Sequence, residues 1–142
     1  MVDYDGKIAC TVFTGGCNLR CPFCHNASLV KNEIAETFPT EEIIAFLKKR
    51  VGLLDGVCLT GGEPLLNSDA ADFLAEVKSL GYSVKLDTNG TFPERLKEIV
   101  SEKLVDYVAM DVKNTFEKYP ETVGISGFKV ENVKKSIEFF KI

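Results

Sequence analysis

Two kinds of hydrophobic pattern alternate along the chain. Short runs rich in apolar and β-branched residues predict four strands, at 9–13, 57–60, 83–87 and 106–110. Segments in which apolar residues recur every three or four positions predict four helices, at 41–50, 68–80, 93–104 and 130–140. Ser68 is expected to cap the second of these helices and Gly81 to end it. Strands that alternate with helices are typical of an α/β fold with a parallel sheet of right-handed βαβ units.

Residue types that commonly form binding sites follow each predicted strand directly. The four segments, in the order of the strands, are Cys17–Cys24, Gly61–Pro64, Asp87–Gly90 and Asp111–Lys113. The carboxyl ends of parallel strands meet at one edge of a sheet, which is where α/β proteins place their sites. The sequence therefore predicts one ligand site assembled from four loops.

Composition limits the class of protein. The 142 residues suffice for one domain, and 45% hydrophobic with 27% charged residues is typical of a globular protein. A net charge of −4 argues against nucleic-acid binding through bulk charge. No apolar run approaches the ~20 residues of a membrane helix. The N-terminus lacks the pattern of a secretory signal, so we expect a cytoplasmic protein without a membrane partner.

The cysteines are the most informative residues. Three of the five fall within eight residues, as C-x3-C-x2-C at positions 17, 21 and 24. The odd count argues against a disulfide framework, whereas clustered thiolates suit zinc or an iron–sulfur cluster. Three thiolates could hold three irons of a [4Fe–4S] cube and leave the fourth iron open to a ligand that is not protein. Cys10 and Cys58 lie within strands, and we interpret them as buried structural residues.

Three other interpretations of this segment stay open on the residues alone. The three cysteines could form a zinc site with His25, although His25 directly follows Cys24 and simultaneous ligation is difficult. Cys21 and Cys24 have the spacing of a thioredoxin-type redox pair. With His25 they also match the attachment motif of c-type haem, which requires export.

The C-x3-C-x2-C segment after the first strand and G-G-E-P at 61–64 after the second resemble the radical S-adenosylmethionine (SAM) superfamily. Three further segments resemble the activases of glycyl radical enzymes within it: CHN at 24–26, LDTNG at 86–90 and MDVK at 110–113. The resemblance implies a partial (β/α) TIM-like barrel of parallel strands, with about four βα units in this chain.

The resemblance implies that Cys17, Cys21 and Cys24 bind a [4Fe–4S] cluster, whose open iron binds the amino and carboxylate groups of SAM. Phe23 is implied to lie near the adenine ring or to cover the cluster. His25 is implied to lie at the adenine edge; the alternative is a partly buried hydrogen-bonding residue. No catalytic side chain is implied beyond the cofactors, which carry the radical chemistry.

The G-G-E-P turn is implied to hold the amino-acid end of SAM. Gly61 and Gly62 let the backbone approach the ligand closely. The Glu63 carboxylate is suited to the ammonium group of SAM. The alternative is an ordinary turn in which Glu63 is solvated.

Four residues of the later loops complete the implied site. Asp87 and Asn89 would line the pocket, Asp111 would bind ribose hydroxyls, and Lys113 would bind the methionyl carboxylate. On the residues alone, Asp87 and Asn89 could instead serve a turn or a helix cap, and Lys113 could be a solvated surface lysine.

The resemblance implies an anaerobic activase that generates a glycyl radical on a partner enzyme, with anaerobic ribonucleotide reductase as the first candidate. It also implies flavodoxin or ferredoxin as the reductant. The alternatives are another radical SAM enzyme that acts on a metabolite or peptide, and a non-catalytic iron–sulfur or zinc module.

Residues 1–142 are expected to form the N-terminal portion of a radical SAM domain, because the resembling domains continue through two more βα units. The fourth strand would then have an unpaired edge, which proteins usually cover. We expect the apolar face of the 130–140 helix to pack on the sheet. We also expect that the chain is a fragment or that another copy or subunit completes the edge.

Overall fold

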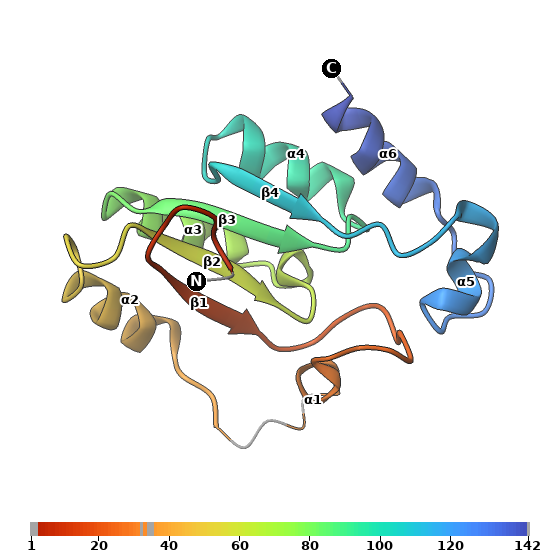
Figure 1. The fold of residues 1–142 in the computed structure, drawn as a ribbon, viewed down its shortest axis with the longest axis horizontal. Coiled ribbons are helices and arrows are strands. Elements are labelled where there is room, and N and C mark those ends of the chain that lie inside the picture. Colours follow the sequence, from red (N-terminus) through yellow and green to blue (C-terminus); the bar gives the residue numbers. More distant parts are fainter. Residues whose placement is uncertain (1–2, 32, 34–35, 142) are drawn as a thin grey trace.

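The sheet has four parallel strands in the order β1-β2-β3-β4. The structure, a computed structural model, describes residues 3–31, 33 and 36–141. Figure 1 shows the strands, which are β1 (Ala9–Thr14), β2 (Gly56–Gly61), β3 (Ser83–Thr88) and β4 (Tyr107–Met110). Each strand pairs with the next one along the chain, which is how (β/α) barrels build their wall. The predicted α/β class and partial barrel are confirmed.

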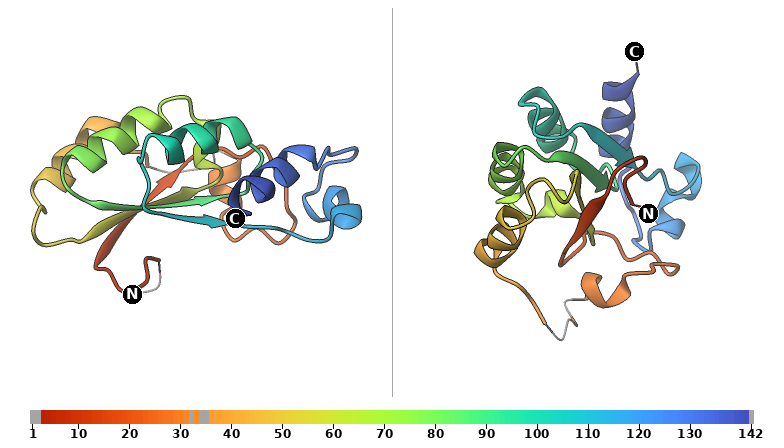
Figure 2. Two further views of the ribbon diagram at one scale, coloured as in Figure 1. Left: turned by 90° about the horizontal axis from the view of Figure 1, so that it is seen from above. Right: turned by 60° about the vertical axis from the view of Figure 1, so that its left-hand side comes forward.

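Three helices connect successive strands and lie on one face of the sheet (Figure 2). They are α2 (Thr40–Lys48), α3 (Ala70–Ser79) and α4 (Pro93–Ser101). The predicted helices match all three, although the N-cap position of α3 is occupied by Asp69 and not by Ser68. Pro93 stands at the start of α4, where its fixed φ and missing N–H suit a first helical turn.

Several short elements have no counterpart in the hydrophobic pattern. They are α1 (Ala27–Val30), the 3₁₀ turns η1 (Pro64–Leu66) and η2 (Phe116–Lys118), and α5 (Tyr119–Thr122). Helices of one turn are too short to show a period, so they are stabilised by tertiary contacts. All of them lie in the loops that follow the carboxyl ends of strands.

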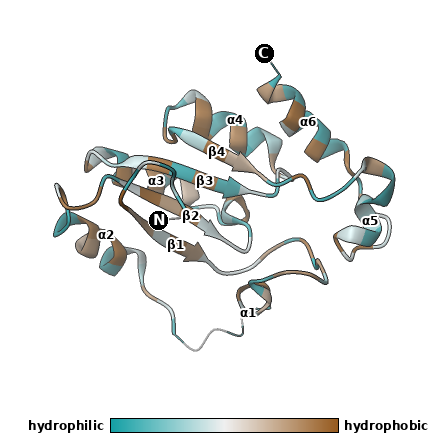
Figure 3. Cartoon of the chain, in the orientation of Figure 1, coloured by the Kyte–Doolittle hydropathy of each residue, from teal (hydrophilic) through white to brown (hydrophobic). Residues whose placement is uncertain are grey.

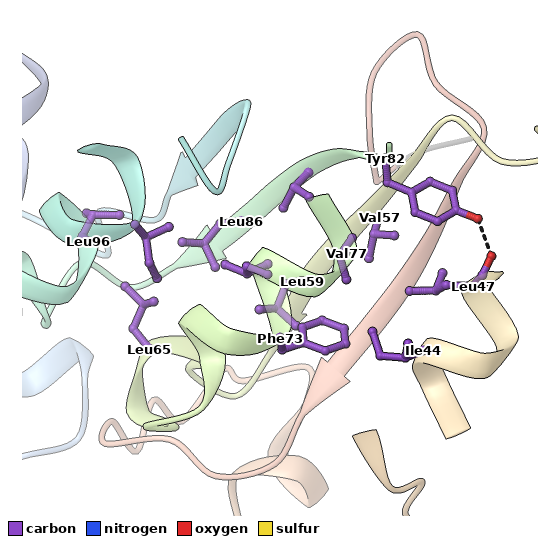
Figure 4. Close-up of a cluster of buried hydrophobic side chains, with 13 residues drawn as sticks. Ile44, Leu47, Val57, Leu59, Leu65, Phe73, Val77, Tyr82, Leu86 and Leu96 are labelled. Atoms are coloured by element: carbon purple, nitrogen blue, oxygen red, sulfur yellow. Dashed lines mark hydrogen bonds between the residues drawn. The ribbon is translucent and has the colours of Figure 1, made fainter. Parts of the chain in front are cut away.

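The main core lies between the sheet and these helices (Figure 4). Val57 and Leu59 of β2 alternate with residues that face the other side, and both are buried against α3. Tyr82 closes one end of the core and donates a hydrogen bond from its hydroxyl to the carbonyl of Leu47 at 2.7 Å. Each fully buried aliphatic side chain contributes about 1.5–3 kcal/mol, which fixes the strands that carry the loops.

The opposite face of the sheet is polar, because alternate strand positions carry polar side chains there. Cys58, Lys85 and Asp87 share this face, and Asp87 joins the other two. The N-terminal segment crosses the same side of the sheet (Figure 2, left). There Thr11 donates a hydrogen bond to Asp3 at 2.9 Å. This face is the inner wall of the partial barrel.

Helix α6 (Glu131–Phe140) corrects one expectation about packing. It lies beside α4 and does not cover the sheet. The Ser136 hydroxyl donates to the carbonyl of Gly90 at 2.7 Å, and Val133 is fully buried in a second, smaller core. Figure 3 shows apolar and polar residues interleaved along α6, as expected for a helix packed on one side only.

The two ends of the sheet, β1 and β4, are its edge strands within the part of the chain that the structure describes. Tyr107 on β4 is 56% exposed, as an unpaired edge predicts. Among the described helices, none has the length and hydrophobicity needed to cross a membrane.

Candidate active site

A cavity of about 780 Å³ opens at the carboxyl ends of the strands. Its volume lies within the ~300–1,000 Å³ usual for small-molecule sites. Residues from all four predicted loops line it. Eleven of the twelve residues singled out in the sequence are among them: Cys17, Cys21, Phe23, Cys24, His25, Gly61, Gly62, Asp87, Asn89, Asp111 and Lys113.

The three clustered cysteines sit in the loop after β1, and all carry free, partly buried thiols. The Cys17 sulfur accepts hydrogen bonds from the backbone N–H of Leu19 at 3.4 Å and from the Asn89 amide at 3.8 Å. Burial raises the pKa of the Cys17 thiol and of the Cys21 thiol. These thiols are therefore protonated at neutral pH without a metal, and metal binding would release their protons.

The Gly61–Gly62 backbone lies directly against this cysteine loop. A Cβ on Gly62 would stand 1.9 Å from the carbonyl oxygen of Gly16, so the close approach requires glycine. The N–H of Gly62 donates to Thr14 at 3.0 Å, and the N–H of Glu63 donates to Gly16 at 2.9 Å. Backbone hydrogen bonds thus join the loops after β1 and β2 and leave the glycine surface open to the cavity.

Glu63 occupies a different environment from the one expected, because its side chain does not line the cavity. It is fully buried, and its carboxylate accepts hydrogen bonds from the Leu65 N–H at 3.1 Å, the Thr88 hydroxyl at 2.7 Å and the Asn89 N–H at 2.7 Å. Burial raises its pKa, while the three donors act in the opposite direction. Contact with a ligand ammonium stays a prediction: the carboxylate has an acceptor site left beside its three donors, but its side chain would first have to become accessible from the cavity.

Replacement of Glu63 by glutamine is expected to lower the free energy of unfolding by about 1–3 kcal/mol. One carboxylate oxygen becomes an NH₂ group, which meets a backbone N–H or the Thr88 hydroxyl where it should accept a hydrogen bond. Thermal unfolding of the metal-free protein measures the effect, with a fall in Tm of roughly 3–10 °C. Glu94→Gln is the matched control because Glu94 is 75% exposed. An equal Tm for both variants would contradict the structural role of Glu63.

The loop after β3 serves a turn and the cavity together. The Asn89 side-chain oxygen accepts from the N–H of Thr91 at 3.0 Å, which is the turn geometry considered above. Its amide nitrogen points the other way and donates to the Asn18 side chain at 3.0 Å and to the sulfur of Cys17. Asn89 therefore does both things considered for it: its side-chain oxygen stabilises the turn, and its amide nitrogen points toward the cysteine loop.

Charged side chains stand on two walls of the cavity. Asp87 is paired with Lys85 at 2.8 Å, and its second oxygen accepts from the Cys58 thiol at 3.6 Å. Lys113 is paired with Asp111. Burial alone would lower the pKa of Lys113, but the Asp111 carboxylate outweighs it and raises that pKa, so Lys113 is a cation. Its side chain is 19% exposed, which does not fit a solvated surface lysine.

The rim of the cavity is formed by Phe23, which is 53% exposed, and by His25. Asn26 of the CHN motif also lines the cavity, as do Lys85 and Arg20, which were not singled out from the sequence. The period of two along β3 could have found Lys85, because it shares a strand face with Asp87. No sequence signal marked Arg20.

Three free thiols on one short loop have the chemistry of iron–sulfur cluster ligands. Across residues 3–31, 33 and 36–141, no three histidine, cysteine or acidic side chains converge tightly enough to share one metal ion. A cube spreads three thiolates over three separate irons, so it does not need three side chains around one ion. The thiols and the glycine backbone of Gly61–Gly62, which a Cβ would obstruct, line the same cavity.

Comparison with known proteins identifies the family. The sequence pattern of the Radical SAM superfamily matches residues 11–141, which is most of the chain. The chain therefore belongs to the radical SAM superfamily, as its motifs predicted. This superfamily uses a [4Fe–4S] cluster and SAM, so the predicted cofactors are confirmed at the level of the family.

Two curated proteins are similar to this chain over most of its length. A protein of Methanocaldococcus jannaschii, named provisionally as a glycyl-radical enzyme activating enzyme, is 43% identical over 126 residues, or 86% of this chain and 50% of that protein. The 7-carboxy-7-deazaguanine synthase of Thermoplasma acidophilum is 31% identical over 132 residues, or 92% of this chain and 57% of the relative. The chain thus spans about half the length of the curated relatives it matches.

A solved structure supports the same fold. The crystal structure of Streptococcus suis SuiB bound to S-adenosylmethionine matches with a TM-score of 0.65 and 20% identity. The match covers 83% of this chain and 28% of SuiB. At this identity the likeness concerns the fold alone, and it agrees with the partial barrel described above.

Proposed function

We propose that this chain carries the cofactor-binding portion of a radical SAM activase that generates a glycyl radical on a partner enzyme. The observation that carries the proposal is the meeting of three free thiols, the Gly61–Gly62 backbone and the Asp111–Lys113 pair around one cavity. The 43% identity to a relative named as an activase supports the finer assignment. Anaerobic ribonucleotide reductase is the partner we propose first.

When bound, the cluster and SAM supply a reductively generated organic radical that can abstract a hydrogen atom. The protein's own residues would bind and orient these groups. Cys17, Cys21 and Cys24 would hold three irons as thiolates. The ammonium of Lys113 would pair with the methionyl carboxylate of SAM, and Asp111 and Asp87 would accept hydrogen bonds from its hydroxyl and amino groups.

The surroundings of the site would protect this chemistry. Leu19 is buried behind the cysteines, and Met110 lines the cavity wall beside them. Apolar walls limit the access of water and oxidants to a reduced cluster. We propose flavodoxin or ferredoxin as the reductant and an anaerobic cytoplasm as the location. Completion of the β4 edge by further strands or by another subunit is also part of this proposal.

Anaerobic reconstitution with iron and sulfide tests the coarser part of the proposal. After dithionite and SAM are added, we expect 5′-deoxyadenosine to form above the level of a control without reductant. Chromatographic quantification of that product is the measurement. Absence of the product at verified cluster content would overturn the assignment for this chain.

The relationship to 7-carboxy-7-deazaguanine synthase supports a second candidate, an enzyme acting on a small metabolite. The charged pair Lys85–Asp87 on the inner wall would suit a polar small molecule. Incubation of the reconstituted protein with purified anaerobic ribonucleotide reductase separates the candidates. A glycyl-radical EPR signal on the reductase supports the activase. SAM cleavage without that signal favours the metabolite enzyme.

A further inference from the structure

The cysteine loop is held from behind by residues 119–133, which we call the clamp segment. The N–H of Arg20, which lies between Cys17 and Cys21, donates to the carbonyl of Val123 at 2.9 Å. Leu19 is buried with four side chains of the clamp segment in the second core: Tyr119, Val123, Val130 and Val133. Cys17 and Cys21 pack against the same core. The cysteine loop thus has a hydrophobic support that is separate from the sheet.

A glycine makes the closest contact between the two segments. Gly124 has a φ of +68°, and a Cβ there would stand 2.3 Å from the carbonyl oxygen of Arg20 and 3.0 Å from its carbonyl carbon. The obstructing atoms are backbone, so no side-chain rotation could relieve the overlap. The Arg20 peptide is therefore fixed on both sides, by the Val123 carbonyl and by the Gly124 backbone.

The clamp segment also holds the loop after β4. The Tyr119 hydroxyl accepts a hydrogen bond from the N–H of Lys113 at 3.2 Å, and the Thr122 hydroxyl accepts from the Asn114 amide at 2.9 Å. The cysteine loop follows β1 and the Lys113 loop follows β4, which are the opposite edges of the sheet. Figure 1 shows α5, within the clamp segment, beyond the ends of the strands on the side of the cysteine loop.

We propose that the clamp segment holds the cysteine loop in the conformation that binds the cluster, with Val123 and Gly124 as positioning residues. The inference rests on the proposed ligand role of Cys17, Cys21 and Cys24. A backbone that is already fixed between the three thiolates lowers the entropy lost when they bind one cube. The strands fix that loop at Cys17, and the clamp segment fixes it at Arg20.

Gly124→Ala tests the proposal, and Gly127→Ala is its matched control. Gly127 has nearly the same φ, +70°, but a Cβ there would meet nothing within 4 Å. Both variants carry the same backbone strain, and only the first displaces Arg20. Hydrogen exchange of the Arg20 amide in the metal-free protein should be roughly tenfold faster in Gly124→Ala than in Gly127→Ala. After reconstitution, the release of iron to a chelator should accelerate by a similar factor.

The outcomes separate this proposal from the proposed function. Equal exchange and equal iron release in the two variants would overturn the clamp. A wild-type protein that assembles no cluster would overturn the ligand assignment, while the exchange comparison still tests the clamp.

If Gly124→Ala does not fold, Val123→Ala takes its place, because it keeps the carbonyl and removes only buried methyl groups. Its Arg20 amide should exchange severalfold faster than in the wild type, and an unchanged rate would contradict the proposal.

Discussion

Replacement of Cys17, Cys21 or Cys24 by alanine, one at a time, is expected to abolish stable [4Fe–4S] assembly. Each thiolate would hold a different iron, so the loss of one leaves the cube with two anchors and two irons without a protein ligand. Iron and sulfide analysis after anaerobic reconstitution, with EPR of the reduced protein, measures the effect. We expect iron content to fall on the order of tenfold in each variant.

The other two cysteines supply matched controls. Cys58 is fully buried, and burial together with the charge of Asp87 raises its thiol pKa to about 12, so it is a poor metal ligand. Cys10 packs against the main core. Cys58→Ala and Cys10→Ala should reconstitute fully, with a stability loss of about 1 kcal/mol or more from the space left behind. A folded Cys58→Ala protein without a cluster would contradict the assignment.

His25→Ala distinguishes the cluster from the zinc interpretation. A zinc site made by three cysteines and His25 would lose a ligand in this variant, whereas a cube held by three thiolates would not. Normal iron and sulfide content in His25→Ala is therefore the expected result. The exposure of His25 at the cavity rim agrees with it, because a metal ligand needs a partner for its second ring nitrogen.

The gathering of the four loops could be predicted because it depends on strand ends alone. Cys17 and Lys113 are far apart in sequence, but each follows a parallel strand directly. Alternation of apolar residues marks where such strands stop, and parallel pairing brings their carboxyl ends to one edge. Eleven of the twelve predicted site residues consequently line the same cavity.

The direction of a side chain could not be predicted in the same way. The G-G-E-P motif specifies a carboxylate at position 63 but not the side to which it turns. Leu65, Thr88 and Asn89 supply three donors in the interior, and two of them come from the end of β3 and the residue after it, which are distant in sequence. Only the packed structure brings these donors together. The sequence therefore predicts the loop that carries Glu63 but not the burial of its side chain.

The packing of α6 shows a second limit. Val130 and Val133 form an apolar stripe, and such a stripe predicts burial without specifying the partner. From the sequence, the sheet was the expected packing partner of this stripe. In the structure, Leu19 and Tyr119 provide a separate core, and Tyr119 belongs to a one-turn helix that leaves no periodic signal. The clamp segment is therefore visible only in three dimensions.

Gly62→Ala is expected to separate the loops after β1 and β2. The new Cβ would stand 1.9 Å from the Gly16 carbonyl oxygen and 3.3 Å from the Cβ of Cys17, so backbone must move. The hydrogen bonds that Gly16 and Thr14 accept from this turn would be lost with the movement. We expect the free energy of unfolding to fall by about 3 kcal/mol or more, and reconstituted iron content and SAM affinity to fall with it.

Gly81→Ala is the control for this last prediction. Gly81 follows α3 with a φ of +89°, and a Cβ there would meet nothing within 4 Å, so alanine adds backbone strain without displacing a loop. Its loss of stability should stay near 1 kcal/mol, and its cluster content should be that of the wild type. A Cβ on Gly62 would collide with Gly16 and crowd Cys17. Gly62→Ala should therefore lose more stability than Gly81→Ala, which adds backbone strain only. A Gly62→Ala protein with wild-type Tm and iron content would show that the two loops do not need this contact.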